Sequence, residues 1–155
     1  MGQEIERKFL VSSEEWRQSV KNSARLQQGY LSTSAKATVR VRIYDDRDAV
    51  LTLKGKADGI SRAEFEYPIP LEDARQLMDM AKPHIVEKRR FDVPFAGHLW
   101  EVDVFEGQHA GLILAEVEMQ TVDEHVVLPI WVGKEVSTDD RYANASLSRV
   151  AGVPE

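Results

Sequence analysis

Apolar and polar residues alternate along most of this 155-residue chain. A period of two is typical of strands that bury one face and leave the other polar. Eight segments with this pattern are predicted to be strands: 4–11, 27–32, 38–44, 49–56, 62–69, 85–93, 99–106 and 112–119. Most of the connections between them are short, which favours an antiparallel sheet.

Helical periodicity interrupts the strands in only a few places. Residues 71–82 carry an apolar stripe between two prolines, which predicts an amphipathic helix. Residues 12–20 open with Ser-x-x-Glu, a capping box. Asp139 or Asp140 is expected to cap a C-terminal helix, and residues 122–127 are a candidate for a fourth, shorter one.

Composition limits the class of protein. The length suits a single domain over residues 1–155, and 30% charged with 43% apolar residues is an ordinary globular composition. No run approaches the roughly 18 apolar residues of a membrane span, and the N-terminus lacks a secretory signal. The chain has no cysteine, which removes disulfides and thiolate sites. We therefore expect a cytoplasmic protein with no membrane partner, and the net charge of −6 argues against nucleic acid.

Charged residues share one parity within the predicted strands. Glu4, Glu6 and Lys8 would project together from the first strand. The other charged residues of this parity are Arg40, Arg42, Lys54, Lys56, Arg62, Glu64, Glu66, Lys88, Arg90, Glu101, Asp103, Glu116 and Glu118. An ordinary antiparallel sheet also turns one polar face to water, so the alternation alone favours a solvent-exposed face.

The sorting of the charges favours a different interpretation. Like charges repeat at neighbouring same-face positions, as in Glu4-x-Glu6 and Arg40-x-Arg42, although such neighbours repel. The helices also need an apolar surface to cover. Both conditions are met by a closed barrel with helices outside and the charges inside, where ions need water or a ligand around them. A lumen of this kind suits a polyanion together with divalent cations, such as a triphosphate.

Six motifs in chain order carry a resemblance to a known family. They are Glu4-x-Glu6-x-Lys8, Arg40-x-Arg42, Leu51-Thr52-Leu53-Lys54, Glu64-x-Glu66, Lys88-Arg89-Arg90 and Glu116-x-Glu118. Together they resemble the CYTH family of triphosphate tunnel metalloenzymes, in particular the short bacterial inorganic triphosphatases. The resemblance implies an α+β, mainly β fold: an eight-stranded antiparallel β-barrel, or tunnel, with a charged interior and helices packed outside. It also implies metal-dependent hydrolysis of a small-molecule triphosphate, with inorganic tripolyphosphate giving pyrophosphate and phosphate.

The same resemblance implies roles for individual residues. The expected phosphate clamp consists of Lys8, Arg40, Arg42, Lys54, Lys88 and Arg90. The expected ligands of Mg²⁺ or Mn²⁺ are Glu4, Glu6, Glu116 and Glu118, with Glu64 and Asp103 in support. Lys8, Arg42, Lys54, Lys88 and Tyr30 are the candidates for direct action on the reacting phosphate.

Other functions stay open at this point. Related activities are adenylyl cyclase and nucleoside or thiamine triphosphatase, and a different class is polyphosphate binding without hydrolysis. A homodimer is also left open. The four histidines lack ligand spacing and are expected at surface or loop positions.

Overall fold

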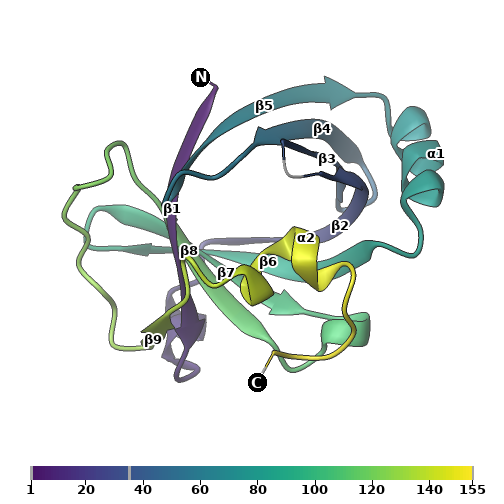
Figure 1. The fold of residues 1–155 in the computed structure, drawn as a ribbon. Helices are drawn as coiled ribbons and strands as arrows, with labels where there is room; N and C mark the ends of the chain where they lie inside the picture. Colours follow the sequence, from purple (N-terminus) through teal and green to yellow (C-terminus); the bar gives the residue numbers. More distant parts are fainter. Residues whose placement is uncertain (1, 35, 155) are drawn as a thin grey trace.

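The computed structural model describes residues 2–34 and 36–154 and contains, within them, one closed antiparallel barrel (Figure 1). The strands are β1 (Gln3–Val11), β2 (Asn22–Thr33), β3 (Ala37–Tyr44), β4 (Asp48–Gly55), β5 (Ser61–Ile69), β6 (Ile85–Phe95), β7 (His98–Phe105), β8 (Ile113–Glu118) and β9 (Val132–Glu135). Their order is β5-β4-β3-β2-β6-β7-β8-β1-β9, and an added pairing of β5 with β1 closes the ring. The predicted eight-stranded barrel is confirmed, with one strand more than expected.

Strand β1 is the closing strand of the barrel. One of its edges pairs with β8 from Glu6 to Leu10. The other edge is shared, because Gln3–Ile5 pair with β5 whereas Phe9 and Val11 pair with β9. The seam between the two ends of the sheet is therefore only three residue pairs long.

The outer face of the barrel is apolar and is covered in two places. Helix α1 (Leu71–Ala81) packs Ala74 and Met78 on Val41 and Ile43 of β3. Gly29 lets this helix approach, because a Cβ there would lie 2.8 Å from the Ala81 Cβ and from the Met78 sulfur. The prediction of a helix over 71–82 is thus confirmed.

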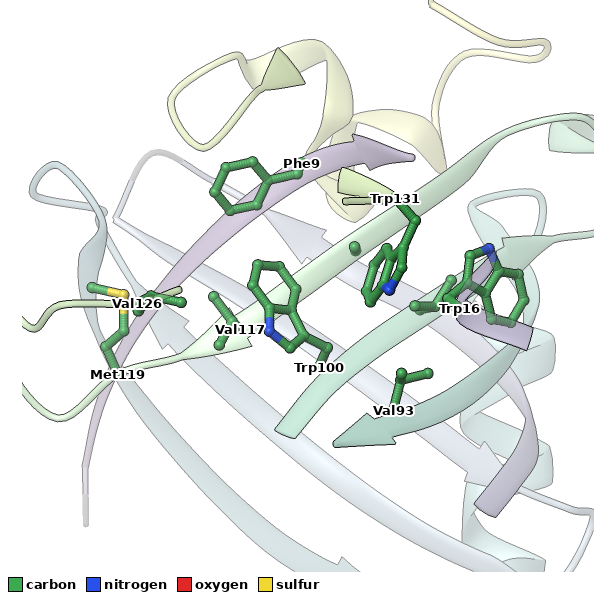
Figure 2. Close-up of a cluster of buried hydrophobic side chains, with 10 residues drawn as sticks. Phe9, Trp16, Val93, Trp100, Val117, Met119, Val126 and Trp131 are labelled. Atoms are coloured by element: carbon green, nitrogen blue, oxygen red, sulfur yellow. The ribbon is translucent and has the colours of Figure 1, made fainter. Parts of the chain in front are cut away.

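Three buried tryptophans cover the outer face of the other half of the barrel (Figure 2). Trp100 of β7 meets Phe9 of β1 at a ring-centroid distance of 5.6 Å and Trp131 at 5.7 Å. Trp16, fully buried, packs against Phe91 of β6 with the ring planes tilted and the centroids 5.1 Å apart. Hydrocarbon therefore lies outside the ring of strands, as the parity of the sequence predicts.

Two helix predictions differ from the structure. Residues 12–20 form only a short 3₁₀ turn, η1 (Glu15–Ser19), whose N-cap Glu14 makes no side-chain capping bond. The prediction of a helix that begins with a capping box is therefore wrong. The buried Trp16, and not a run of helical hydrogen bonds, holds this segment in place. Residues 122–127 form no helix and belong to the irregular connection between β8 and β9.

The C-terminal segment also departs from the expected helix. It forms a 3₁₀ turn, η3 (Asp140–Tyr142), which Asp139 caps by accepting from the Arg141 N–H at 3.1 Å, and then the four-residue helix α2 (Asn144–Leu147). His109, in the 3₁₀ turn η2 (Gly107–His109), is fully buried and not at the surface. Its Nε2 donates to two carbonyl oxygens of this segment, those of Leu147 at 2.6 Å and Val150 at 2.9 Å.

This segment closes part of the barrel interior. Tyr142 and Leu147 pack against the inward-facing Val86, Phe105 and Leu114. The interior is therefore apolar where the C-terminal segment seals it and ionic elsewhere. No helix in the described part of the chain is long and apolar enough to cross a membrane.

Candidate active site: the charged interior of the barrel

A cavity of about 260 Å³ lies inside the barrel, and charged side chains dominate its wall. Its basic lining residues are Lys8, Arg40, Arg42, Lys54, Arg62, Lys88 and Arg90. Its acidic lining residues are Glu4, Glu6, Glu64, Glu66, Glu101, Glu116 and Glu118. Tyr30 lines the same cavity. The ionic parity of the strands therefore points inward, as expected.

The structure brings together twelve of the thirteen candidate site residues of the sequence analysis. The exception is Asp103, which is buried at 1% exposure but does not line the cavity. Lys56 shares the charged parity but is exposed and also lies outside the lining. Parity thus predicts the direction of a side chain but not whether the side chain reaches the lumen.

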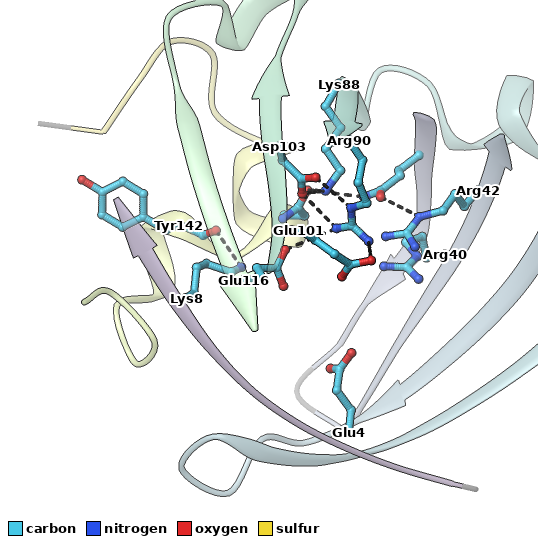
Figure 3. Close-up of polar contacts among 12 residues, drawn as sticks. Glu4, Lys8, Arg40, Arg42, Lys88, Arg90, Glu101, Asp103, Glu116 and Tyr142 are labelled. Atoms are coloured by element: carbon cyan, nitrogen blue, oxygen red, sulfur yellow. Dashed lines mark hydrogen bonds and ion pairs between the residues drawn. The ribbon is translucent and has the colours of Figure 1, made fainter. Parts of the chain in front are cut away.

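Four cations gather on one side of the cavity (Figure 3). Arg40 and Arg42 come from β3, and Lys88 and Arg90 come from β6. Burial lowers the pKa of Arg42, and the neighbouring Arg40 and Arg90 lower it further. Such repulsion is relieved by an anion, so this side of the cavity suits the oxygens of a phosphate chain.

Asp103 holds two of these cations from behind. Its carboxylate accepts from Arg90 Nε at 2.7 Å and Nη2 at 2.9 Å, and from Lys88 Nζ at 2.6 Å. Burial lowers the pKa of Lys88 to about 7, against the attraction of Asp103. Burial alone would raise the pKa of Asp103, but Arg90 and Lys88 lower it. Asp103 is therefore an ionised counter-charge with its oxygens engaged.

Carboxylates gather near the seam of the barrel. Lys54 Nζ lies between Glu4 of β1, at 3.0 Å, and Glu64 of β5, at 3.5 Å. The carboxyl groups of Glu6 and Glu116 are hydrogen-bonded to each other, and burial together with Glu116 raises the pKa of Glu6 well above its usual range. Lys8 and Arg90 hold the pKa of Glu116 well below its usual range despite burial. The pKa values of these two neighbouring carboxyl groups are therefore shifted in opposite directions.

The Glu118 side chain is exposed. Glu118 lies directly opposite Glu6 in the pairing of β8 with β1. Among the described residues, no three carboxylate or imidazole groups converge tightly enough to enclose a metal ion. The acidic side is thus a set of separate hard oxygen donors, with Lys54 inserted between two of them.

The C-terminal segment adds a part of the wall that sequence reasoning missed. Asn144 of α2 lines the cavity, and its Oδ1 accepts from Lys88 Nζ at 2.9 Å. Lys8 Nζ donates to the Tyr142 carbonyl at 3.2 Å (Figure 3). No periodic pattern marks Asn144, because it follows a 3₁₀ turn. Arg62, Glu66 and Glu101 share the charged parity and also line the cavity, although no role in the site was predicted for them.

Comparisons with known proteins agree with this geometry. The CYTH domain family matches residues 2–151. The inorganic triphosphatase of Acetivibrio thermocellus is 41% identical over 95% of this chain and 94% of its own length. The inorganic triphosphatase of Nitrosomonas europaea is 35% identical over 94% of this chain and 96% of its own. The crystal structure of the inorganic triphosphatase NE1496 has a TM-score of 0.69 at 32% identity, and the match covers 96% of this chain and 99% of that one. With an ionic cavity inside a closed antiparallel barrel and a match over nearly its whole length, this chain belongs to the CYTH family.

Proposed function

We propose that this protein is a triphosphatase that needs a divalent cation, and that its substrate is inorganic tripolyphosphate, cleaved to pyrophosphate and phosphate. One observation carries the proposal: a cavity within the barrel is lined both by a cluster of four neighbouring cations and by buried carboxylates. A polyanion fits the first set and a hard cation the second. The two curated relatives, both named inorganic triphosphatases, point to the same substrate.

The size and lining of the cavity favour an inorganic substrate over a nucleotide. About 260 Å³ suits a phosphate chain better than a nucleoside triphosphate, since pockets that bind drug-sized ligands measure roughly 300–1,000 Å³. The uncharged lining residues in the described chain are Tyr30, Thr38, Tyr44, Ala143, Asn144 and Ala145. These offer little apolar surface for adenine or thiamine, which disfavours the adenylyl cyclase and thiamine triphosphatase alternatives.

The phosphate clamp would be the six lining cations that also match the family motifs. Lys88, Arg90, Arg40 and Arg42 would hold successive phosphate oxygens, with Lys8 and Lys54 on the β1 and β4 walls. Their charge would stabilise the electron density that builds on the leaving oxygen as the anhydride bond breaks. The Tyr30 hydroxyl would donate to a phosphate oxygen.

The acidic residues fit a divalent cation by the chemistry of their donors. Glu4, Glu6, Glu64, Glu116 and Glu118 supply only carboxylate oxygens, the ligands that Mg²⁺ and Mn²⁺ prefer. A cation there would also relieve the burial and like-charge repulsion that now raise the pKa of Glu4 and Glu6. When bound, it would neutralise phosphate charge and favour the nucleophilic form of water. We propose Mg²⁺ or Mn²⁺.

Hydrolysis would proceed by attack of water on a terminal phosphorus, in line with the departing pyrophosphate. A P–O bond to the water oxygen forms, the bridging P–O bond breaks, and the electron pair leaves with the pyrophosphate. Such transfers need positioning and charge compensation more than covalent help, and a fixed ring of cations provides both. The water proton would pass to a cavity carboxylate or to the phosphate product.

Polyphosphate binding without hydrolysis is the second candidate function. The cation cluster would serve it equally well, but capture of an anion gains nothing from seven lining carboxylates.

We further propose one domain over residues 1–155, acting in the cytoplasm. Light scattering would test the homodimer left open above.

Phosphate release decides among these functions. Tripolyphosphate, ATP and thiamine triphosphate are each incubated with Mg²⁺, Mn²⁺ or Ca²⁺, and with EDTA. We expect one phosphate and one pyrophosphate per tripolyphosphate, slower release from the others, and none in EDTA. Release from no substrate would favour the binding function, and cyclic AMP from ATP would favour the cyclase.

A further inference from the structure

Gln28 on β2 is a neutral side chain in an ionic neighbourhood. It is fully buried, has the parity of Tyr30, and pairs directly with Arg42 of β3 across the sheet. Strand β2 lies between β3, which carries Arg40 and Arg42, and β6, which carries Lys88 and Arg90. Gln28 does not itself line the cavity.

The amide of Gln28 joins three groups that do line the cavity. Its Oε1 accepts from Arg42 Nε at 2.7 Å. Its Nε2 donates to the Tyr30 hydroxyl at 3.1 Å and, more weakly, to Asn144 Oδ1 at 3.4 Å. An arginine nitrogen can only donate, so the carbonyl end of the amide must face Arg42 and the NH₂ end must face Tyr30.

This arrangement fixes Arg42 without neutralising it. The Arg42 guanidinium is bonded to Gln28 and, at 3.0 Å, to the Tyr44 hydroxyl, both uncharged. In residues 2–34 and 36–154, no carboxylate lies within ion-pair distance of Arg42. Arg90, by contrast, pairs with three carboxylates, those of Glu101, Asp103 and Glu116. Among these two arginines, Arg42 is the one whose full charge remains available to an anion.

The same amide sets the direction of the Tyr30 hydroxyl. A hydroxyl has one proton to donate and two lone pairs. Because Gln28 occupies a lone pair as donor, the Tyr30 proton is free for an acceptor in the cavity. A carboxylate at position 28 would instead accept that proton and would pair with Arg42.

We propose that Gln28 is a positioning residue, which orients Arg42 and Tyr30 toward the substrate while leaving the charge of Arg42 and the proton of Tyr30 available. This inference rests on the proposed triphosphatase function. It requires that a neutral amide, rather than a carboxylate or an apolar group of similar size, occupies this position.

Two substitutions separate the parts of this role. Gln28→Glu supplies an acceptor for Arg42 but adds a buried negative charge. We expect an unfolding midpoint in urea equal to or above that of the unchanged protein, because the new carboxylate meets cations on both neighbouring strands. The KM for tripolyphosphate should rise at least about tenfold, because Arg42 is then neutralised. Gln28→Met keeps the volume but removes both hydrogen bonds, so kcat should fall at least about tenfold with KM changed less.

Gln27 provides the matched control. It is the next residue of β2, of opposite parity, and bonds to Glu87 outside the barrel. Gln27→Glu and Gln27→Met should leave kcat and KM within about twofold of the unchanged protein. A purely structural role for Gln28 predicts instead that each variant loses activity in step with its loss of stability.

The outcomes are distinct. Gln28→Glu with KM within about twofold of the unchanged protein, or Gln28→Met with kcat within that range, would overturn the proposal. If Gln28→Glu does not fold, the kcat and KM of Gln28→Met decide. If the unchanged protein cleaves no tripolyphosphate, the proposed function fails separately. Calorimetric binding of tripolyphosphate in EDTA then tests Gln28, and equal affinity of all variants would overturn its role.

Discussion

Replacing Asp103 by asparagine would remove the counter-charge of two buried cations while keeping the size of the side chain. The carboxylate is 1% exposed and accepts two hydrogen bonds from Arg90 and one from Lys88, all within 2.9 Å. An asparagine there keeps one acceptor oxygen and directs an NH₂ group at a cation. The substitution therefore distinguishes a structural counter-ion from the metal ligand that the sequence led us to expect.

The size of the effect follows from the burial of the pair. Removing one partner of a buried ion pair costs about 3–5 kcal/mol, because an uncompensated charge is left behind. Arg90 keeps Glu101 at 3.3 Å and Glu116 at 3.4 Å, which favours the lower half of that range. At roughly 2–4 °C per kcal/mol for a domain of this size, the thermal unfolding midpoint should fall by about 6–16 °C.

The assay combines thermal and urea unfolding with a metal titration of tripolyphosphate cleavage. We expect Asp103→Asn to lose stability while the Mg²⁺ or Mn²⁺ concentration for half-maximal activity stays unchanged. The control is Asp79→Asn on α1, which alters an exposed ion pair with Lys82, the residue that follows the helix. It should change stability by less than about 0.5 kcal/mol. If Asp103→Asn kept its stability and needed more metal, Asp103 would be a metal ligand and our reasoning would be wrong.

Four further predictions follow from the same structure. Lys8→Ala should lower kcat/KM for tripolyphosphate more than about tenfold, and an unchanged value in steady-state kinetics would remove Lys8 from the clamp. Glu4→Gln should raise the metal concentration needed for half-maximal activity; a titration identical to that of the unchanged protein would contradict its role as a ligand. Trp16→Ala, at a fully buried position, should cost about 3–5 kcal/mol in urea unfolding, and a loss below about 1 kcal/mol would show that η1 contributes little. The hydrogen bond from Arg7 lowers the pKa of Glu135 below 4.5, so this pair stabilises the protein at neutral pH and loses its effect as the pH falls through that lowered pKa. Glu135→Gln should accordingly cost less than about 1 kcal/mol near pH 7 and nothing in strong acid, and a pH-independent difference would refute the linkage.

The barrel and most of its charged lining could be predicted because the period of two is a local property of each strand. Alternation in 38–44 already places Arg40 and Arg42 on one face and Val41 on the other, and the structure puts them inside and outside. Alternation does not indicate whether an inward-facing side chain reaches the cavity or is buried among its neighbours. Asp103 has the parity of a lining residue, yet it is 1% exposed, and its carboxylate binds Lys88 and Arg90, which do line the cavity.

Parts of the site that depend on distant segments had no local signal. Strand β9 is four residues long and pairs with a strand more than 120 positions earlier. Asn144 reaches Lys88 because His109 and an apolar cluster hold the C-terminal segment in place, and neither contact is periodic in sequence. Gln28 could not be predicted for another reason: it is uncharged, whereas the pattern that marks the site consists of charged residues.

The arrangement of charge explains why an acidic protein can take a polyanion. Seven basic and seven acidic residues in the cavity lining cancel, so the net charge of −6 is not carried there. Repulsion from that net charge is screened beyond about 8 Å at physiological ionic strength. Within the cavity, Arg40, Arg42 and Arg90 act on a ligand at contact distance. The medium there is less polar than water, so the Coulomb energy of each charge is larger. The sign of the ligand is therefore set by the cations that carboxylates neutralise least. Among Arg40, Arg42 and Arg90, only Arg42, bonded to Gln28 and Tyr44, has no carboxylate within ion-pair distance in the described part of the chain.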